Sequence, residues 1–198
     1  MGYVEGSLVL MADYSQKEIS DICVGDIILG ADLNPSTVTE SFSSKLGNRR
    51  IMSFLGNKQV RFTDCDVIWA KDSTRQWWWT ENAHELQLAW KNMRLNSKNH
   101  LLTGFKIIDS MLVSYDVEFA TINGFEKKTV IDVTEEYSEN TFIPMIKTER
   151  FCPVIINDFV VGGGICEHEY DYTKFNWMNS YNQLRKSDKL DLIKNRIV

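Results

Sequence analysis

The sequence predicts an all-β domain followed by a helical tail, and two observations carry this prediction. Short apolar runs rich in β-branched and aromatic residues recur through the first four-fifths of the chain, separated by turn-forming residues. Beyond position 164 the apolar side chains change to a helical spacing, as at Trp177, Tyr181 and Leu184. We therefore expect a β domain over residues 1–164 and a docking tail over residues 165–198.

The expected strands can be placed in chain order from their apolar runs and turn signals. Gly56-Asn57 predicts a hairpin, and Asn123-Gly124 predicts a second one that joins residues 120–122 to 127–133. Near the end, the stretch IINDFVVGGG predicts a strand, a tight turn and a second strand that stops at three glycines. The expected strands before this stretch are 7–12, 27–29, 49–54, 60–62, 67–70, 107–119 and 129–134.

Two helical segments interrupt the expected strands, and more follow in the tail. Residues 16–22 predict a helical turn, and Asn82 with Glu85 forms a capping box before a longer helix through Met93. In the tail, Ser187 is a candidate N-cap for a last helix. A tail of this length cannot bury a core of its own, so we expect it to dock on the β domain or on another molecule.

Composition narrows the classes of function. The 198 residues carry a net charge of −5, which argues against a nucleic-acid binder with a basic face. No apolar run approaches the ~20 residues that span a bilayer, and the N-terminus lacks the basic flank of a signal peptide. We therefore expect no membrane partner and no secretion through a signal peptide.

The cysteines and histidines are spaced too widely to predict a metal site. No two of the four cysteines form a C-x-x-C pair, and the three histidines are scattered. We expect no metal and no cofactor, and we expect the cysteines to be reduced, buried thiols. The four are Cys23, Cys65, Cys152 and Cys166.

Four blocks of the sequence, taken together, resemble Hint domains, the autoprocessing fold of inteins and hedgehog proteins. The opening block, Gly6 to Gly30, contains Gly6-Ser7, an apolar strand, Val24-Gly25-Asp26 and a second apolar strand. A middle block follows over residues 60–70, and two closing blocks cover 129–142 and 155–164. The resemblance spans roughly residues 2–164. It implies a compact β fold built around a peptide-cleaving site.

The sequence departs from the Hint pattern at each position that carries the chemistry. The resemblance implies a Cys or Ser nucleophile, a T-x-x-H histidine that assists at the scissile amide, and a closing His-Asn pair. Here the nucleophile position is Gly2, with only Met1 before it. The T-x-x-H motif becomes Thr63-Asp64-Cys65-Asp66, and the closing pair becomes Gly162-Gly163. We therefore expect a domain that has lost autoprocessing and is not an enzyme.

A residual self-cleaving or splicing-type enzyme is the alternative hypothesis. Ser7 could attack the carbonyl of Gly6, and Cys65 and Cys166 are the other candidate nucleophiles. Asp66 would serve as a base only if burial raised its pKa. We expect Cys65 to lie within a strand and to pack in the core, and we expect a structural role for Cys166.

Clustered aromatic residues are the candidate binding surfaces. Exposed tryptophans are enriched at protein interfaces, and aromatic residues among polar ones are typical of docking segments. Stacking on single-stranded nucleic acid, helped by the nearby Arg75, or on carbohydrate is a further alternative. The candidate residues are Trp77, Trp78, Trp79, Tyr170, Tyr172, Phe175, Trp177 and Tyr181.

The partners expected are other protein subunits in an oligomer. Hint-like domains also occur in viral and phage structural proteins, so the analogy suggests a phage tail or baseplate component. It places the protein in a virion or in the host cytoplasm.

Overall fold

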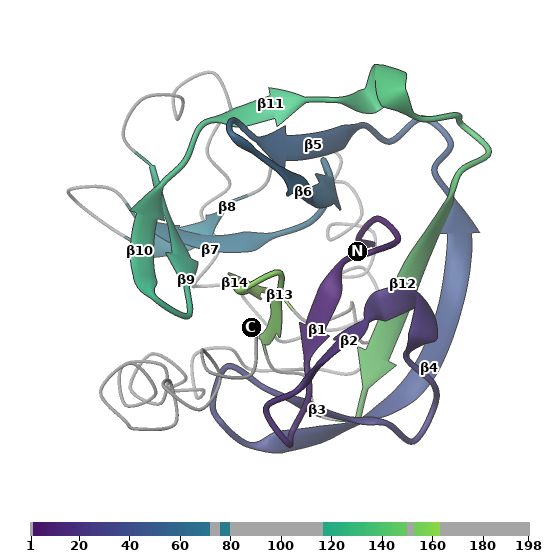
Figure 1. Cartoon of the computed structure of the whole chain (residues 1–198), viewed down its shortest axis with the longest axis vertical. Helices are drawn as coiled ribbons and strands as arrows, with labels where there is room; N and C mark the ends of the chain where they lie inside the picture. Colours follow the sequence, from purple (N-terminus) through teal and green to yellow (C-terminus); the bar gives the residue numbers. More distant parts are fainter. Residues whose placement is uncertain (1, 72–75, 80–116, 150–152, 163–198) are drawn as a thin grey trace, which may run out of the picture.

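The computed structural model describes residues 2–71, 76–79, 117–149 and 153–162. Within these residues the chain forms β-strands and two short 3₁₀ turns, Ile19–Asp21 and Thr134–Glu136. The strands make three sheets that surround a common interior (Figure 1). Among these residues, no helix is long and apolar enough to cross a membrane.

The largest sheet brings together both ends of the described chain. Its order is β10-β9-β7-β14-β13-β1-β2, and β8 pairs with β7 away from this path. The strands are β1 (Leu8–Leu10), β2 (Gln16–Glu18), β7 (Ile68–Lys71), β8 (Gln76–Trp79), β9 (Glu118–Thr121), β10 (Gly124–Lys127), β13 (Val154–Ile156) and β14 (Phe159–Val161).

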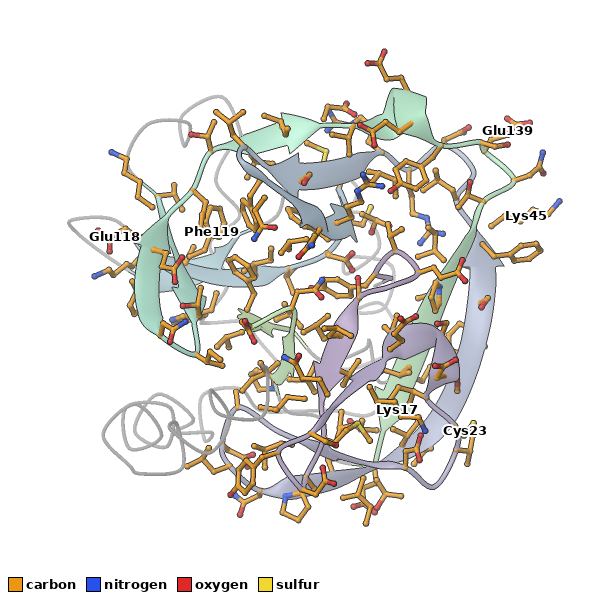
Figure 2. The ribbon with its side chains drawn as sticks, viewed as in Figure 1. Lys17, Cys23, Lys45, Glu118, Phe119 and Glu139 are labelled. Carbon is orange, nitrogen blue, oxygen red and sulfur yellow. The ribbon has the colours of Figure 1, made fainter. Side chains whose placement is uncertain are left out.

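Two three-stranded sheets complete the fold. One has the order β11-β5-β6, with β5 at Ile51–Phe54, β6 at Asn57–Thr63 and β11 at Val130–Asp132. The other has the order β12-β4-β3, with β3 at Ile27–Leu29, β4 at Pro35–Lys45 and β12 at Phe142–Thr148. The long β4–β12 ribbon forms one side of the molecule, and Lys45 and Glu139 lie near its outer end (Figure 2).

Aromatic side chains fill the interior between the sheets. Phe54 lies at their centre, with its ring centroid 5.3 Å from that of Phe62, 5.1 Å from Phe119 and 4.8 Å from Phe159. Each of these side chains is buried, and the four come from β5, β6, β9 and β14. The cluster therefore joins the large sheet to the β5–β6 hairpin through burial of apolar area.

The first strand lies beside the last hairpin, which determines where the site forms. Val9 of β1 pairs with Ile156 of β13, and Val161 of β14 pairs with Ile68 of β7. Upstream of β1, Tyr3 forms a bridge to Phe62 of β6. The N-terminal segment, the β6–β7 turn and the end of β14 consequently meet near the centre of the molecule (Figure 1).

Most of the strands expected from apolar runs are present. The IINDFVVGGG stretch forms the β13–β14 hairpin, and β3 has the expected bounds 27–29. The hairpin at Gly56 is also present, because Phe54 pairs with Asn57 across it. The Asn82 helix and the tail lie outside the described residues. So does the expected strand 107–119, except for its last three residues.

Two expectations about local structure were wrong, and two strands were not expected. Residues 16–18 form a strand that pairs with β1, and Lys17 lies opposite Val9. Only Ile19–Asp21 form a helical turn, which is a 3₁₀ helix. The Asn123-Gly124 hairpin ends at Lys127, and β11 instead pairs with β5 in another sheet. The strands β4 and β12 were not expected. In β4, residues 39–45 are exposed or half-buried and mostly polar, so no apolar run marks the strand.

Candidate functional site

A buried carboxylate, that of Asp66, ties the N-terminal segment to the turn between β6 and β7. Its Oδ1 accepts a hydrogen bond of 2.8 Å from the backbone N–H of Gly2. Its Oδ2 accepts hydrogen bonds from the backbone N–H of Thr63, at 2.7 Å, and from the Thr63 hydroxyl, at 3.0 Å. Asp66 is fully buried, so these three donors replace the water that an exposed carboxylate would have.

Gly2 is held in a space that has no room for a side chain. A Cβ built on Gly2 would lie 2.3 Å from Cγ2 of Ile143 and 3.3 Å from Cγ of Met145. Ile143 is fully buried, and its Cγ2 is attached directly to the branched Cβ, so it cannot easily move aside. The side chains of β12 therefore occupy the region where a residue-2 side chain would project.

The end of β14 lies next to the same turn. The backbone N–H of Gly162 donates to the carbonyl of Val67, the residue after Asp66, at 3.0 Å. Gly162 is buried. The structure thus brings together four of the positions singled out in the sequence, Gly2, Thr63, Asp66 and Gly162. Gly163 lies outside the described residues.

The neighbours of Asp66 determine its protonation. Burial raises the pKa of Asp66 to about 6, while the hydrogen bonds from Thr63 and Gly2 act in the opposite direction. The adjacent Asp64 is also buried, but Arg50 lies 3.3 Å from its carboxylate. The positive charge of the N-terminus and the hydrogen-bond donors therefore compensate Asp66, whereas Asp64 has a guanidinium partner.

Tyr3 is a buried member of this site that the sequence did not reveal. Its hydroxyl has no hydrogen-bond partner among the described residues, and burial and then the charge of Asp66 raise the pKa of Tyr3 well above its usual value. The phenol therefore stays protonated beside the carboxylate. Nothing in the sequence marks it, because Tyr3 is simply one aromatic residue ahead of an apolar strand.

The candidate nucleophiles occupy different surroundings. Cys65 lies in the turn after β6 and is half-buried, so the expectation that it packs within a core strand was wrong. Burial, and then the charge of Asp64, raise the pKa of Cys65 to about 12. Ser7 is buried ahead of β1, and its carbonyl accepts a hydrogen bond from Ile19. Cys166 lies outside the described residues.

The cysteines are not all buried thiols as expected. Cys23 is exposed at the surface, near Lys17 (Figure 2). Its backbone N–H donates to Asp26, which also pairs with Lys17 at 2.7 Å. Among the residues that the structure describes, no three histidine, cysteine or acidic side chains are grouped to hold a metal ion.

The tryptophans of the candidate binding surface lie on β8. In the β7–β8 pairing Trp78 is opposite Trp69, while Trp77 and Trp79 are opposite Ala70 and Ile68. Ala70 and Ile68 are buried, and Trp69 is half-buried. The tail aromatics, from Tyr170 to Tyr181, lie outside the described residues.

Comparison with known proteins yields similar structures only. No protein-family model matches the sequence, and no curated protein matches it either. The chain is similar to the crystal structure of a DnaB intein from Synechocystis, with a TM-score of 0.49 and 12% identity over 83% of this chain and 100% of that one.

Two further structures are similar over comparable lengths. The intein-like domain from Clostridium thermocellum gives a TM-score of 0.46 and 14% identity over 82% of this chain and 98% of that chain. The gp41-1 intein gives 0.43 and 12% over the same shares of the two chains. Inteins are the class of domain that the sequence blocks resemble. These are likenesses of fold, so the chemistry of this chain rests on its own residues.

The raised pKa of Asp66 predicts a pH-dependent stability. The unfolded carboxyl loses its proton near 3.8, whereas the folded one keeps it up to about 6. The protonated Asp66 therefore contributes up to about 3 kcal/mol to the free energy of unfolding. This contribution is complete below pH 4 and is lost as the pH rises through 6. Urea unfolding of the wild type and of Asp66→Asn at several pH values measures it. The difference in unfolding free energy between the wild type and Asp66→Asn should shrink as the pH rises from about 4 to 7. A difference that stays constant would contradict the raised pKa of Asp66.

The packing around Gly2 predicts a coupled cost for an added methyl group. Gly2→Ala should lower the free energy of unfolding by about 1–3 kcal/mol, because the new Cβ overlaps Cγ2 of Ile143. In an Ile143→Ala background that methyl group is absent, so the same change should cost less. Urea unfolding of the two single variants and the double variant measures the coupling. Equal costs in both backgrounds would show that the contact is not responsible.

Proposed function

We propose that this chain is a structural or interaction module that keeps a Hint-like fold and has lost its peptide-cleaving chemistry. A single arrangement carries the proposal. The carboxylate of Asp66 binds the backbone N–H of Gly2, while Ile143 fills the space where a side chain on residue 2 would project. Two steps of the autoprocessing that the sequence resemblance implies meet an obstacle in this arrangement.

The first obstacle is the nucleophile. An acyl shift needs a hydroxyl or thiol on the residue whose N–H belongs to the scissile bond. Gly2 has neither, and its surroundings leave no space for one. This argument concerns shape as well as sequence, because restoring a cysteine or serine at position 2 would require β12 to move.

The second obstacle is the proton transfer at the amide. A general acid would donate a proton to the leaving nitrogen, but Asp66 accepts a hydrogen bond from that nitrogen's N–H. With a pKa of about 6, Asp66 is mainly ionised at neutral pH. It therefore stabilises the intact peptide bond at residue 2 and anchors the strand.

A role in assembly follows from the analogy with Hint-like domains of viral and phage structural proteins. We propose a virion component, such as part of a phage tail or baseplate, that contacts other protein subunits. Support for this role comes from the aromatic residues at 77–79 and in the tail, since such residues are enriched at protein interfaces.

Residual self-cleavage is the second candidate function, and the half-buried Cys65 beside Asp66 is the observation in its favour. A pKa of about 12 leaves only about one thiol in 10⁵ ionised at pH 7, so attack by Cys65 would be slow. Ser7 is buried in the turn before β1, and no described histidine serves it as a base. The geometry therefore favours the non-cleaving module.

The intact mass of the purified protein tests the loss of cleavage. We expect the full-length mass to persist for days at pH 7, with and without added thiol or hydroxylamine, because residue 2 offers no nucleophile. Gradual appearance of a shortened chain would instead support self-cleavage. In that case Ser7→Ala, Cys65→Ser and Cys166→Ser, measured separately, would identify the attacking group.

Native mass in solution tests the assembly role. We expect the wild type to form oligomers whose population rises with concentration, and we expect Trp177→Ala combined with Tyr181→Ala to lower their mass. Leu55→Ala is the matched control, since Leu55 is an exposed apolar residue in the β5–β6 turn. A wild type that stays monomeric, or an aromatic variant that assembles normally, would refute this role.

A further inference from the structure

A polar cleft of about 600 Å³ opens between the first hairpin, β6 and the turn of the last hairpin. Its volume lies within the range of small-ligand sites. Three carboxylates line it, those of Glu5, Glu18 and Asp158, together with the amides of Asn157 and Gln16. None of the three carboxylates pairs with a lysine or arginine in the part of the chain that the structure describes.

Among the described residues that line the cleft, Arg61 is the only cation, and it is already engaged. Arg61 contacts Glu136 at 2.9 Å and also donates to the hydroxyl of Tyr137. The cleft therefore presents uncompensated negative charge. Such a surface attracts cationic groups and repels phosphates and other anions.

Of the three carboxylates, Asp158 is the most buried and would gain most from a bound cation. It is half-buried, and its side chain accepts a single hydrogen bond of 3.3 Å, from the Gln16 amide. Burial, and then the charge of Glu126, raise the pKa of Asp158. A cation bound in the cleft would offset both the lost hydration and the repulsion from Glu126.

The neighbouring Asn157 offers an unused donor. Its Oδ1 accepts from the N–H of Leu8 at 2.8 Å, which fixes the amide's orientation. The Nδ2 atom of Asn157 is buried and finds no acceptor among the described residues. A buried donor without a partner is costly, so the fold bears this cost at the turn that lines the cleft.

The turn conformation makes aspartate an unfavourable choice at position 158 on local grounds. Asn157 and Asp158 have φ values of 49° and 69°, in a two-residue turn between β13 and β14. Turns of this kind prefer Asn-Gly, because glycine adopts positive φ without strain. Asp158 thus combines a positive φ, partial burial and a nearby like charge, none of which stabilises an aspartate at this position of the fold.

We propose that this cleft binds a basic side chain of a peptide, lysine or arginine, with Asp158 as its counter-ion. Glu5 and Glu18 lie exposed at the rim and add longer-range attraction. The inference goes beyond the proposed loss of cleavage and does not depend on it. It predicts that a partner protein presents a lysine or arginine to the cleft, which is a different part of the surface from the Asp66 site.

An NMR titration of the full chain with two matched peptides tests the proposal. The probes are acetyl-Gly-Gly-Arg-Gly-Gly-amide and the same peptide with citrulline, which has nearly the same shape without the charge. We expect the arginine peptide to shift the amide signals of Asn157 and Asp158 saturably, and to bind at least tenfold tighter than the citrulline peptide. Equal affinities, or no shift at these residues, would overturn the proposal.

Two variants at one position separate binding from folding. Asp158→Asn removes the charge and should weaken binding of the arginine peptide at least tenfold. The control is Asp21→Asn, which changes an exposed acid away from the cleft and should leave the affinity unchanged. Asp158→Gly should also lose binding but should raise the urea midpoint, because glycine suits the turn. Retention of affinity in either Asp158 variant would overturn the assignment. A stable full-length mass alongside such a result would leave the proposed function intact.

Discussion

The hydrogen bonds to the Asp66 carboxylate are the interaction on which the arrangement of the site depends. A carboxylate that is fully buried loses its hydrating water and needs donors from the protein, and Asp66 takes them from two separate segments. The direct backbone bonds between the same segments are long, at 3.4 Å for Val4 to Arg61 and for Thr63 to Gly2. The charge-assisted bond from Gly2, at 2.8 Å, is therefore the stronger link.

This anchoring explains how a short N-terminal segment keeps its place in the middle of the fold. Tyr3 is fixed opposite Phe62, and the next residues lead into β1, which pairs with β13. The first and last described strands become neighbours, and the end of β14 reaches the carbonyl of Val67. In a domain that cuts at its termini, this geometry would gather the reacting groups. Here the same geometry gathers a glycine, a hydrogen-bonded carboxylate and another glycine.

The parts of this structure that the sequence predicts are those coded by apolar runs. Residues 27–29 and the β13–β14 hairpin were expected because each is short, apolar and bounded by turn residues. The β4 strand escaped prediction because its outer half is polar and exposed, and β2 because pairing with β1 overrides its weak local pattern. Likewise, the resemblance picked out Gly2 and Asp66, but the contact that closes the space at Gly2 comes from Ile143 in a distant strand.

The fully buried Asp66 and the half-buried Asp158 show why a raised pKa alone does not identify a working site. Burial is the largest cause of the shift for both. Asp66 is surrounded by three short hydrogen bonds from its own chain, so no acceptor capacity is directed at a ligand. Asp158 has one long hydrogen bond and lines an open cleft beside an unused amide donor. Satisfaction by the protein itself is what separates an anchor from a binding group. By this criterion Asp66, to which the sequence resemblance points, is an anchor within the fold, whereas the proposed binding site lies at the turn of the last hairpin.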